Sequence, residues 1–284
     1  MGINRDSIYS YYVERGDEIF REELTDHVKE ALSTIPSKQS KISQYIEKML
    51  GRVDISFADA VRLSIIFHDI GKIFYQKNYK YDKKHNVRYL SFTGHEFLSS
   101  YIFNKFTFYL TNSEALSKIL SACNFSILFH HHAMNPRCRA SLYRKPAITV
   151  GKAVIDEVKI EKLKILNQFL NSSEVGPWRD TINNVRVEVE KSKDVNVFIE
   201  GVVNSMFSQQ GLGSKIWRIF IGDPIFRKTS LALLSTLLVA DYLSALKLRP
   251  KSKPTTFHNV LREFYSYYLS NTFTEPKNKS KILS

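Results

Sequence analysis

Apolar residues recur every three or four positions along most of the chain, a spacing typical of helices that bury one face. Ser56 is a good helix N-cap with Gly71 as a stop signal, and Asp223 followed by Pro224 indicates another helix start. The pattern predicts helices over residues 13–35, 42–50, 56–70, 94–110, 113–132, 156–169, 223–246 and 255–269. We therefore expect a mostly α-helical bundle.

The middle of the chain, residues 135–211, is less regular. Within it, residues 137–150 and 185–189 fit either loops or a short β-hairpin. No internal repeat and no long Gly/Ser linker divides the sequence. We predict one domain over residues 1–272 with an insertion at about 137–222, followed by a basic flexible tail at 273–284.

The composition is that of a globular protein, with 43% hydrophobic and 24% charged residues among 284. The two cysteines, Cys123 and Cys138, form no CxxC pair, which argues against a zinc ribbon or a disulfide scaffold. The N-terminus is too polar for a signal peptide, and Asp241 interrupts the most apolar stretch, residues 231–240. We expect a cytoplasmic protein with no membrane partner.

The charge balance favours a polyanionic partner, because 41 Lys and Arg against 28 Asp and Glu give a net charge of +13. Basic residues alternate with tyrosines after residue 75, and a mixture of this kind can follow a phosphate backbone while stacking bases. Solvated loops are the alternative interpretation. The candidate nucleic-acid-binding residues are Lys77, Lys80, Lys83, Lys84, Arg88, Arg137 and Arg139.

Candidate metal ligands lie in or beside the predicted helices. Asp241 lies in the most apolar helix, where a carboxylate is costly to bury unless it is paired or binds a cation. Lys72 follows Asp69 by three residues and suits a phosphate oxygen. A glycine at position 71 allows a sharp backbone turn. The histidines of this set are His27, His68, His95, His130, His131 and His132.

The order His27, His68-Asp69 and Asp241 resembles the H…HD…D signature of HD-domain phosphohydrolases, and Gly94-His95-Glu96 resembles its two-metal subgroup. With Gly71-Lys72 and the Ala-Asp-Tyr-Leu-Ser segment at 240–244, the set is similar to the HD nuclease of the type I CRISPR-associated nuclease–helicase. The length is similar to the archaeal form whose helicase is a separate chain. The resemblance covers about residues 20–245 and implies an HD-domain helical bundle.

Two departures from the family pattern affect the ligand assignment. The family has two adjacent histidines followed by Gly, whereas this chain has three followed by Ala133. We align His131 and His132 with the pair, which leaves His130 as a competitor. The long gap before Asp241 implies the insertion.

The resemblance implies two divalent ions. One would be held by His27, His68, Asp69 and Asp241, and the other by His95, His131 and His132 with Asp69 bridging. Imidazole with carboxylate suits Mn, Fe, Co, Ni or Zn better than Mg, although the abundance of Mg keeps it a candidate. Asp69 and Lys72 would be catalytic, and Ser244 would contact the nucleic-acid backbone or a ligand, or be an ordinary helix serine.

We therefore expect a metal-dependent nuclease that hydrolyses phosphodiester bonds of single-stranded DNA in CRISPR interference, with RNA and both endonuclease and exonuclease modes left open. Gly71-Lys72 and Gly151-Lys152 are followed by Ile73 and Ala153, so neither completes a P-loop. A separate helicase and an RNA-guided surveillance complex are the implied partners. The alternatives are a phosphohydrolase of (d)NTP or cyclic nucleotides and a non-catalytic nucleic-acid-binding subunit.

Overall fold

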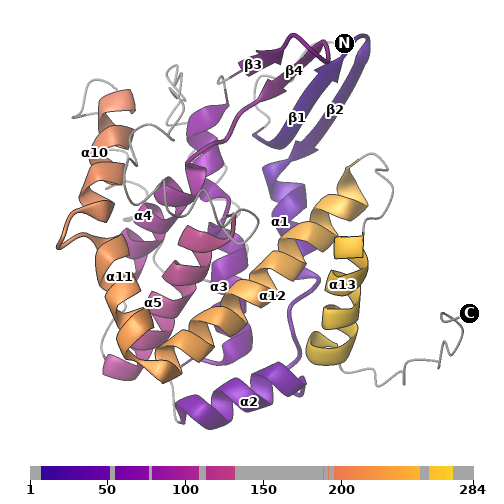
Figure 1. Cartoon of the computed structure of the whole chain (residues 1–284). Helices are drawn as coiled ribbons and strands as arrows, with labels where there is room; N and C mark the ends of the chain where they lie inside the picture. The colour runs from indigo at the N-terminus through magenta and orange to yellow at the C-terminus, as the bar shows by residue number, and fades with distance from the viewer. Residues whose placement is uncertain are drawn as a thin grey trace, which may run out of the picture.

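The computed structural model describes residues 8–51, 55–76, 79–108, 113–131, 188, 191, 195–249 and 256–270. This part of the chain is mostly helical, and a four-stranded antiparallel sheet lies at one end of the helices (Figure 1). The elements are β1 (Tyr9–Arg15), β2 (Glu18–Glu23), α1 (Leu24–Leu32), α2 (Lys41–Leu50), α3 (Phe57–Phe67), the 3₁₀ helix η1 (Ile70–Tyr75), β3 (Tyr79–Asp82), β4 (Val87–Leu90), α4 (His95–Thr107), α5 (Glu114–Phe129), α10 (Val195–Phe207), α11 (Leu212–Gly222), α12 (Pro224–Leu248), α13 (Thr256–Phe264) and the π-helical turn η3 (Tyr265–Leu269).

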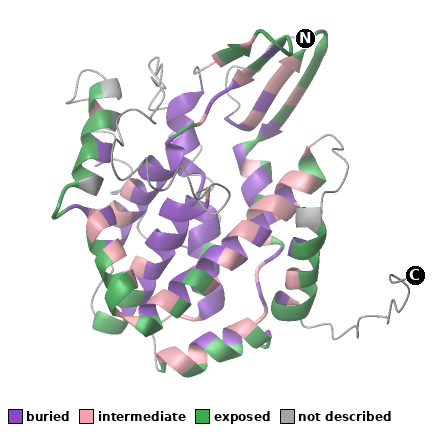
Figure 2. Ribbon diagram, viewed as in Figure 1, coloured by how far each residue is buried: buried purple, intermediate pink, exposed green. Residues whose placement is uncertain are grey.

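The core lies where α3, α4, α5 and α12 meet, and Figure 2 shows their buried faces turned toward one another. Both predicted helix starts are confirmed. Ser56 caps α3 in a capping box, because its hydroxyl accepts from the Asp59 N–H while the Asp59 carboxylate accepts from the Ser56 N–H. Asp223 caps α12 by accepting from the N–H groups of Ile225 and Phe226.

Helix α12 is the long apolar helix of the fold. Its 25 residues are long and apolar enough to cross a membrane by length and composition alone. In the structure its central residues Leu233, Leu237 and Ala240 are buried in the main core, and the helix packs against α5, α1 and α3. It is therefore the central core helix of this fold.

The helix predicted over residues 13–35 is only partly present, because the chain first forms the β1–β2 hairpin and α1 begins at Leu24. Aromatic and β-branched residues such as Tyr11 and Val13 favour strands. Gly16 has a φ of +58°, which supports the tight turn between Arg15 and Glu18. The apolar spacing that we interpreted as one helix therefore spans a strand and a helix.

A second hairpin, β3–β4, lies in the stretch of basic residues and tyrosines for which no helix or strand was predicted, and the strand order in the sheet is β2-β1-β4-β3. The Gln76 side chain joins the sheet to η1, because its amide oxygen accepts from the Tyr9 N–H at 2.8 Å and its amide nitrogen donates to the Tyr9 carbonyl at 3.0 Å. This contact holds the start of β1 beside η1, the turn that follows the His68-Asp69 pair.

Helices α10 and α11 fall within the predicted insertion, and they pack against α4, α5 and α12. Val203, Met206 and Ile216 belong to the same core as α3 and α5. The predicted helix at 156–169 and the candidate hairpin segment at 137–150 lie outside the described residues, as does the predicted tail at 273–284. Of segment 185–189 the structure describes Glu188 alone, which accepts from Lys105.

Candidate metal centre

Five helices bring their candidate ligands to one place. His27 comes from the middle of α1, Asp69 follows α3, His95 is the first residue of α4, and Asp241 lies in the second half of α12. Two short-range features bring the chain into position: η1 turns away directly after Asp69, and Gly94 at the start of α4 has a φ of +90°. The residues gather into two groups, His27–His68–Asp69–Asp241 and Asp69–His95–His130–His131.

The first group joins α1, α3 and α12. His27 Nε2 lies 3.1 Å from Asp241 Oδ1 and 3.5 Å from Asp69 Oδ2. His68 Nε2 lies 3.4 Å from Asp69 Oδ2 and 3.9 Å from Asp241 Oδ1. The four ligand atoms all lie within 4.8 Å of one another, a spacing that allows one ion to contact them all.

The second group joins the other oxygen of Asp69 to α4 and to the end of α5. His95 Nε2 lies 2.9 Å from Asp69 Oδ1, and His130 Nε2 lies 3.8 Å from the same oxygen. His131 Nε2 lies 3.2 Å from His95 Nε2. Asp69 thus presents Oδ2 to one group and Oδ1 to the other, as a carboxylate shared by two ions does.

The structure places the competitor His130 in the second group together with His131. His132, the other member of the aligned pair, lies outside the described residues. His130 is fully buried, and its Nδ1 binds the Ile127 carbonyl at 2.7 Å. Because α5 ends at Phe129, His130 and His131 follow the last helical residue directly and both reach the centre of the cluster.

Buried imidazole nitrogens without a hydrogen-bond partner indicate whether the residues fit a metal ion. The Nε2 atoms of His27, His68 and His130 are buried and have no hydrogen-bond partner. The Nδ1 atoms of His68, His95 and His130 lie 2.6–2.7 Å from the backbone carbonyls of Ile65, Phe92 and Ile127. A carbonyl accepts a hydrogen bond, so Nδ1 carries a proton in each of these rings, and in the neutral tautomer Nε2 is the nitrogen that can bind a metal. Lone pairs that converge with carboxylates in a buried site fit a divalent cation.

Three residues behind His27 hold its ring in place. Glu22 Oε1 accepts from His27 Nδ1 at 2.8 Å, and Glu22 Oε2 accepts from Arg249 Nε at 2.7 Å. The hydroxyl of Ser244 donates to the His27 carbonyl at 2.8 Å. Ser244 is fully buried, so its hydroxyl contacts a candidate ligand inside the protein and not the surface where nucleic acid would bind. Sequence reasoning missed Glu22 as a member of the site, because it belongs to no ligand motif.

The electrostatics of the centre favour cations. Burial raises the pKa of Asp69, but the neighbouring His68 and Lys72 outweigh it and hold this pKa well below its ordinary value. Burial also raises the pKa of Asp241, but His27 and His68 outweigh it, so this pKa too lies well below its ordinary value. Burial lowers the pKa of His27, while Asp241 and Glu22 raise it to about 9. Burial, with His130 and His95 adding to it, depresses the pKa of His131. Both carboxylates are therefore ionised at neutral pH.

Lys72 and Gly71 follow the His68-Asp69 pair in η1. Lys72 Nζ donates to Asp69 Oδ2 at 2.6 Å and to the Ser10 carbonyl at 3.3 Å, and only 5% of the residue is exposed. We expected Gly71 to provide a sharp turn and a helix stop, but α3 ends earlier and Gly71 is not among the described residues with positive φ. A Cβ there would lie 2.1 Å from the His95 carbonyl oxygen, so glycine is needed for the close approach of η1 to α4.

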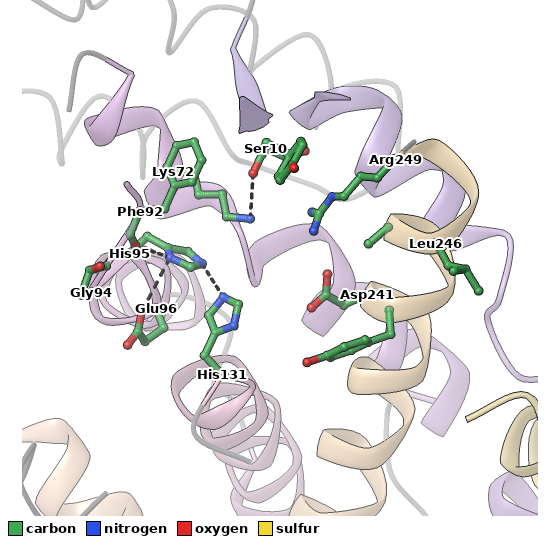
Figure 3. Close-up of a pocket in the computed structure, with 14 residues that line it drawn as sticks. Ser10, Lys72, Phe92, Gly94, His95, Glu96, His131, Asp241, Leu246 and Arg249 are labelled. Carbon is green, nitrogen blue, oxygen red and sulfur yellow. Dashed lines mark hydrogen bonds and ion pairs between the residues drawn. The ribbon is translucent and has the colours of Figure 1, made fainter. Parts of the chain in front are cut away.

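A cavity of about 520 Å³ opens directly on this cluster. Figure 3 shows Lys72, Arg249 and Asp241 directed toward one common space, with His131 at its edge. The cavity combines candidate ligands, two cationic side chains and an apolar wall that includes Phe92 and Leu246. Its lining residues are Ser10, Tyr11, Lys72, Phe92, Thr93, Gly94, His95, Glu96, His131, Asp241, Tyr242, Ala245, Leu246 and Arg249.

Apart from Ser244 in α12, the predicted nucleic-acid-binding residues that the structure describes lie on the β3–β4 hairpin. Lys80, Lys83, Lys84 and Arg88 are all exposed there. Arg88 donates to Glu14 Oε2 at 3.2 Å, and its guanidinium carbon lies 4.1 Å from the centre of the Tyr79 ring. Lys77, Arg137 and Arg139 lie outside the described residues.

Comparison with known proteins gives no relative: no family model, no curated protein and no solved structure matches this chain.

Proposed function

We propose that this chain is a metal-dependent phosphodiesterase of the HD type that hydrolyses single-stranded DNA, with RNA as a second possible polymer substrate. One observation carries the proposal. Asp69 presents one oxygen to each of two histidine groups, and three buried Nε2 atoms in those groups lack any hydrogen-bond partner. A pair of sites that share a carboxylate beside a cationic cavity is the arrangement that two-ion phosphoester hydrolysis requires.

The ligand sets follow from the two groups. His27, His68, Asp69 and Asp241 would hold one ion, and Asp69, His95, His130 and His131 would hold the other. Divalent ions of the Mn, Fe, Co, Ni or Mg class supply a Lewis acid for the phosphoryl oxygen and lower the pKa of water. Backbone carbonyls and Glu22 orient the imidazoles, so that the ring nitrogens need little rearrangement.

Two cationic side chains of the cavity suit the substrate phosphate. Lys72 and Arg249 both line the cavity, and a phosphodiester there would meet positive charge from two sides. Lys72 lies at the shared carboxylate, where it can neutralise a non-bridging oxygen of the reacting phosphate. Arg249 is held by Glu22, which fixes its guanidinium before substrate arrives.

The choice of a polymer substrate is supported by positive charge beyond the cavity. The net charge of +13 and the exposed lysines of the β3–β4 hairpin exceed what a mononucleotide needs. We place this activity in CRISPR interference in the cytoplasm, with a separate helicase and an RNA-guided surveillance complex delivering unwound DNA. That assignment rests on the motif resemblance of His27, His68-Asp69 and Asp241.

Cleavage assays with one ligand variant and one matched control test the proposal. Labelled single-stranded DNA, double-stranded DNA, RNA and a panel of nucleotides are incubated with Mn²⁺ or Mg²⁺. Wild type and Asp26→Ala cut single strands, because Asp26 is an exposed carboxylate beside His27 that belongs to neither group. Asp69→Ala loses cleavage completely. Cleavage that persists in Asp69→Ala, or that needs no divalent metal, rejects the proposal.

The second candidate function is hydrolysis of (d)NTP or cyclic nucleotides. The cavity volume of about 520 Å³ favours it, because pockets for small molecules typically measure about 300–1,000 Å³. The same panel decides between the two: hydrolysis confined to mononucleotides retains the metal centre and replaces the substrate. A non-catalytic binding subunit would bind DNA and cleave nothing in the panel.

A further inference from the structure

The two faces of the small sheet carry different side chains, and the strand register assigns them. Residues paired directly across antiparallel strands project from the same face. Val13 pairs with Phe20 on one side and Tyr89 on the other, and Tyr89 pairs with Lys80. Phe20, Val13, Tyr89 and Lys80 therefore form one row across all four strands, on a single face.

This row lies on the face that turns toward the metal centre. Two residues before Val13, Tyr11 projects from the same face and pairs with Glu22. Tyr11 lines the cavity, and Glu22 binds both His27 and Arg249. We call the face with Tyr11, Tyr89 and Lys80 the cavity face of the sheet.

The opposite face carries other tyrosines of the hairpins and the arginines Arg21 and Arg88. Glu14 pairs with Arg88 and Arg88 with Tyr81, while Tyr12 pairs with Arg21. Three of these side chains bind one another, because Arg88 and the Tyr12 hydroxyl both donate to the Glu14 carboxylate. Two residues of one basic stretch, Lys80 and Arg88, thus lie on opposite faces of the sheet.

The cavity face has the chemistry of a surface that binds a single strand. Phe20 and Tyr89 are only partly buried, and Lys80 beside Tyr89 is exposed. At the cavity end, the Arg249 guanidinium carbon lies 4.7 Å from the centre of the Tyr11 ring. Tyr11 and Tyr89 are diagonal neighbours, about 7–8 Å apart. Such a spacing suits successive bases of an extended strand.

The part of the cavity face that suits a nucleic-acid strand ends at the next row of residues, on the side away from the cavity. There the same face carries Arg15 paired with Glu18, and Val87 paired with Asp82. Carboxylates at both edges repel a phosphate backbone. The cavity face therefore has room for a few nucleotides next to the cavity.

We propose that the cavity face of the sheet is a track for two or three nucleotides of a single-stranded nucleic acid that enters the metal centre. A base stacks on Tyr89, and Lys80 contacts the adjacent phosphate. Four-stranded antiparallel sheets with exposed aromatic rings bind two or three bases in this way. The direction of the track toward a reacting phosphate rests on the proposed function, but strand binding by this face can be measured without any cleavage.

Binding of fluorescent oligothymidylates, followed by anisotropy in EDTA, tests the track on the full chain. Wild type binds a 12-nucleotide strand more tightly than a dinucleotide, because only the longer strand reaches Tyr89. Tyr89→Ala weakens binding of the 12-mer about tenfold or more, while Tyr89→Phe keeps it, which separates stacking from misfolding. Tyr81→Ala, an exposed tyrosine on the opposite face, binds like wild type.

A matched pair of variants tests how much positive charge on the cavity face contributes to strand binding. Lys80→Ala lowers the slope of log affinity against log salt by about 0.7, as the loss of one single-strand phosphate contact does. Arg21→Ala removes the same charge from an exposed position on the opposite face and leaves the slope unchanged. Equal effects from the two faces, or no effect from either, overturn the track. Hydrolysis of bis(p-nitrophenyl) phosphate by wild type with Mn²⁺ tests the proposed function separately, so each can fail alone.

Discussion

Lys72 Nζ lies 2.6 Å from Asp69 Oδ2, so a lysine of the cavity wall is ion-paired with the carboxylate that both candidate ligand groups share. The pair is nearly inaccessible, with side-chain exposures of 7% and 1%. In a buried site such a pair neutralises charge that would otherwise be costly. Lys72 and a divalent ion would therefore compete for the same oxygen, Asp69 Oδ2.

Competition for this oxygen predicts opposite effects of Lys72→Ala on the stability of the metal-free protein and on its affinity for metal. Without metal, the variant loses about 3–5 kcal/mol of unfolding free energy, because a buried Asp69 is left without its cation. Its affinity for Mn²⁺ is at least that of wild type, while kcat falls about 100-fold or more through loss of phosphate stabilisation. Calorimetric titration, denaturant unfolding and cleavage assays measure the three quantities.

Lys29→Ala, at an exposed position of α1, serves as control for the Lys72 variant and should change none of the three. Loss of Mn²⁺ binding in Lys72→Ala would contradict the prediction, since it would make the lysine a support of the metal site.

Metal stoichiometry separates the two groups. Wild type is expected to bind two Mn²⁺ ions, Asp241→Ala one and His95→Ala one, because these residues belong to one group each. Asp69→Ala should bind none, because its two oxygens face different groups. Elemental analysis after dialysis gives the counts, with His85→Ala as control because His85 lies on the exposed hairpin and belongs to neither group. A wild type that binds only one ion, together with three variants that bind none, would reject the two-site arrangement.

Cys123 gives a prediction about pH that is independent of the metal. Burial raises the pKa of its thiol to about 12, from an ordinary value near 9. A thiol that stays protonated when folded but ionises when unfolded stabilises the fold below pH 9, and this contribution is lost as the pH rises toward 12. We expect unfolding free energy to fall by up to about 1.4 kcal/mol per pH unit above pH 9.

Cys123→Ala is the matched variant, because alanine fits the same buried position without a titrating group. Denaturant unfolding between pH 8 and about pH 10.5 should show a shallower decline in this variant than in wild type. Identical pH slopes in the two proteins would mean that the Cys123 thiol does not carry this dependence.

The sequence was sufficient to predict most of the described helices and most of the residues that gather in the candidate metal centre. Capping residues mark helix starts by local chemistry, and Ser56 and Asp223 act where they were expected. Asp241 was identified because a carboxylate in an apolar helix needs a partner, and in the structure it lies 3.1 Å from His27. These predictions succeed because the signal lies within a few residues of the feature.

Features that depend on distant contacts could not be predicted in this way. The helical spacing around Ile19 and Phe20 fits a strand as well, and only pairing with β1 decides between them. Glu22 binds both His27 and Arg249 because β2 lies beside α1 and the end of α12, and no local sequence pattern predicts this contact. Gly71 is required by a helix 24 residues further on, since its partner is the carbonyl of His95. The sheet also divides Lys80 from Arg88, which the sequence places in one basic stretch.

Glu22 and Arg249 offer the final prediction, because one carboxylate connects a candidate ligand to a candidate substrate contact. Arg249→Gln removes a cation from the cavity but leaves the bond between Glu22 and His27, so KM for single-stranded DNA rises about tenfold while Mn²⁺ affinity stays unchanged. Glu22→Gln weakens both metal binding and substrate binding. Mn²⁺ affinity falls about 10- to 100-fold, because the His27 ring loses its charged acceptor. KM rises, because Arg249 loses the carboxylate that holds its guanidinium.

The two variants have to be compared in the same titration and the same cleavage assay. A connected pair predicts that Glu22→Gln combines the KM effect of Arg249→Gln with a metal defect, and that the double variant raises KM no further than either single one. Additive effects on KM would show that Glu22 and Arg249 act separately. Unchanged Mn²⁺ affinity in Glu22→Gln would mean that His27 keeps its orientation through Ser244 and its own helix alone.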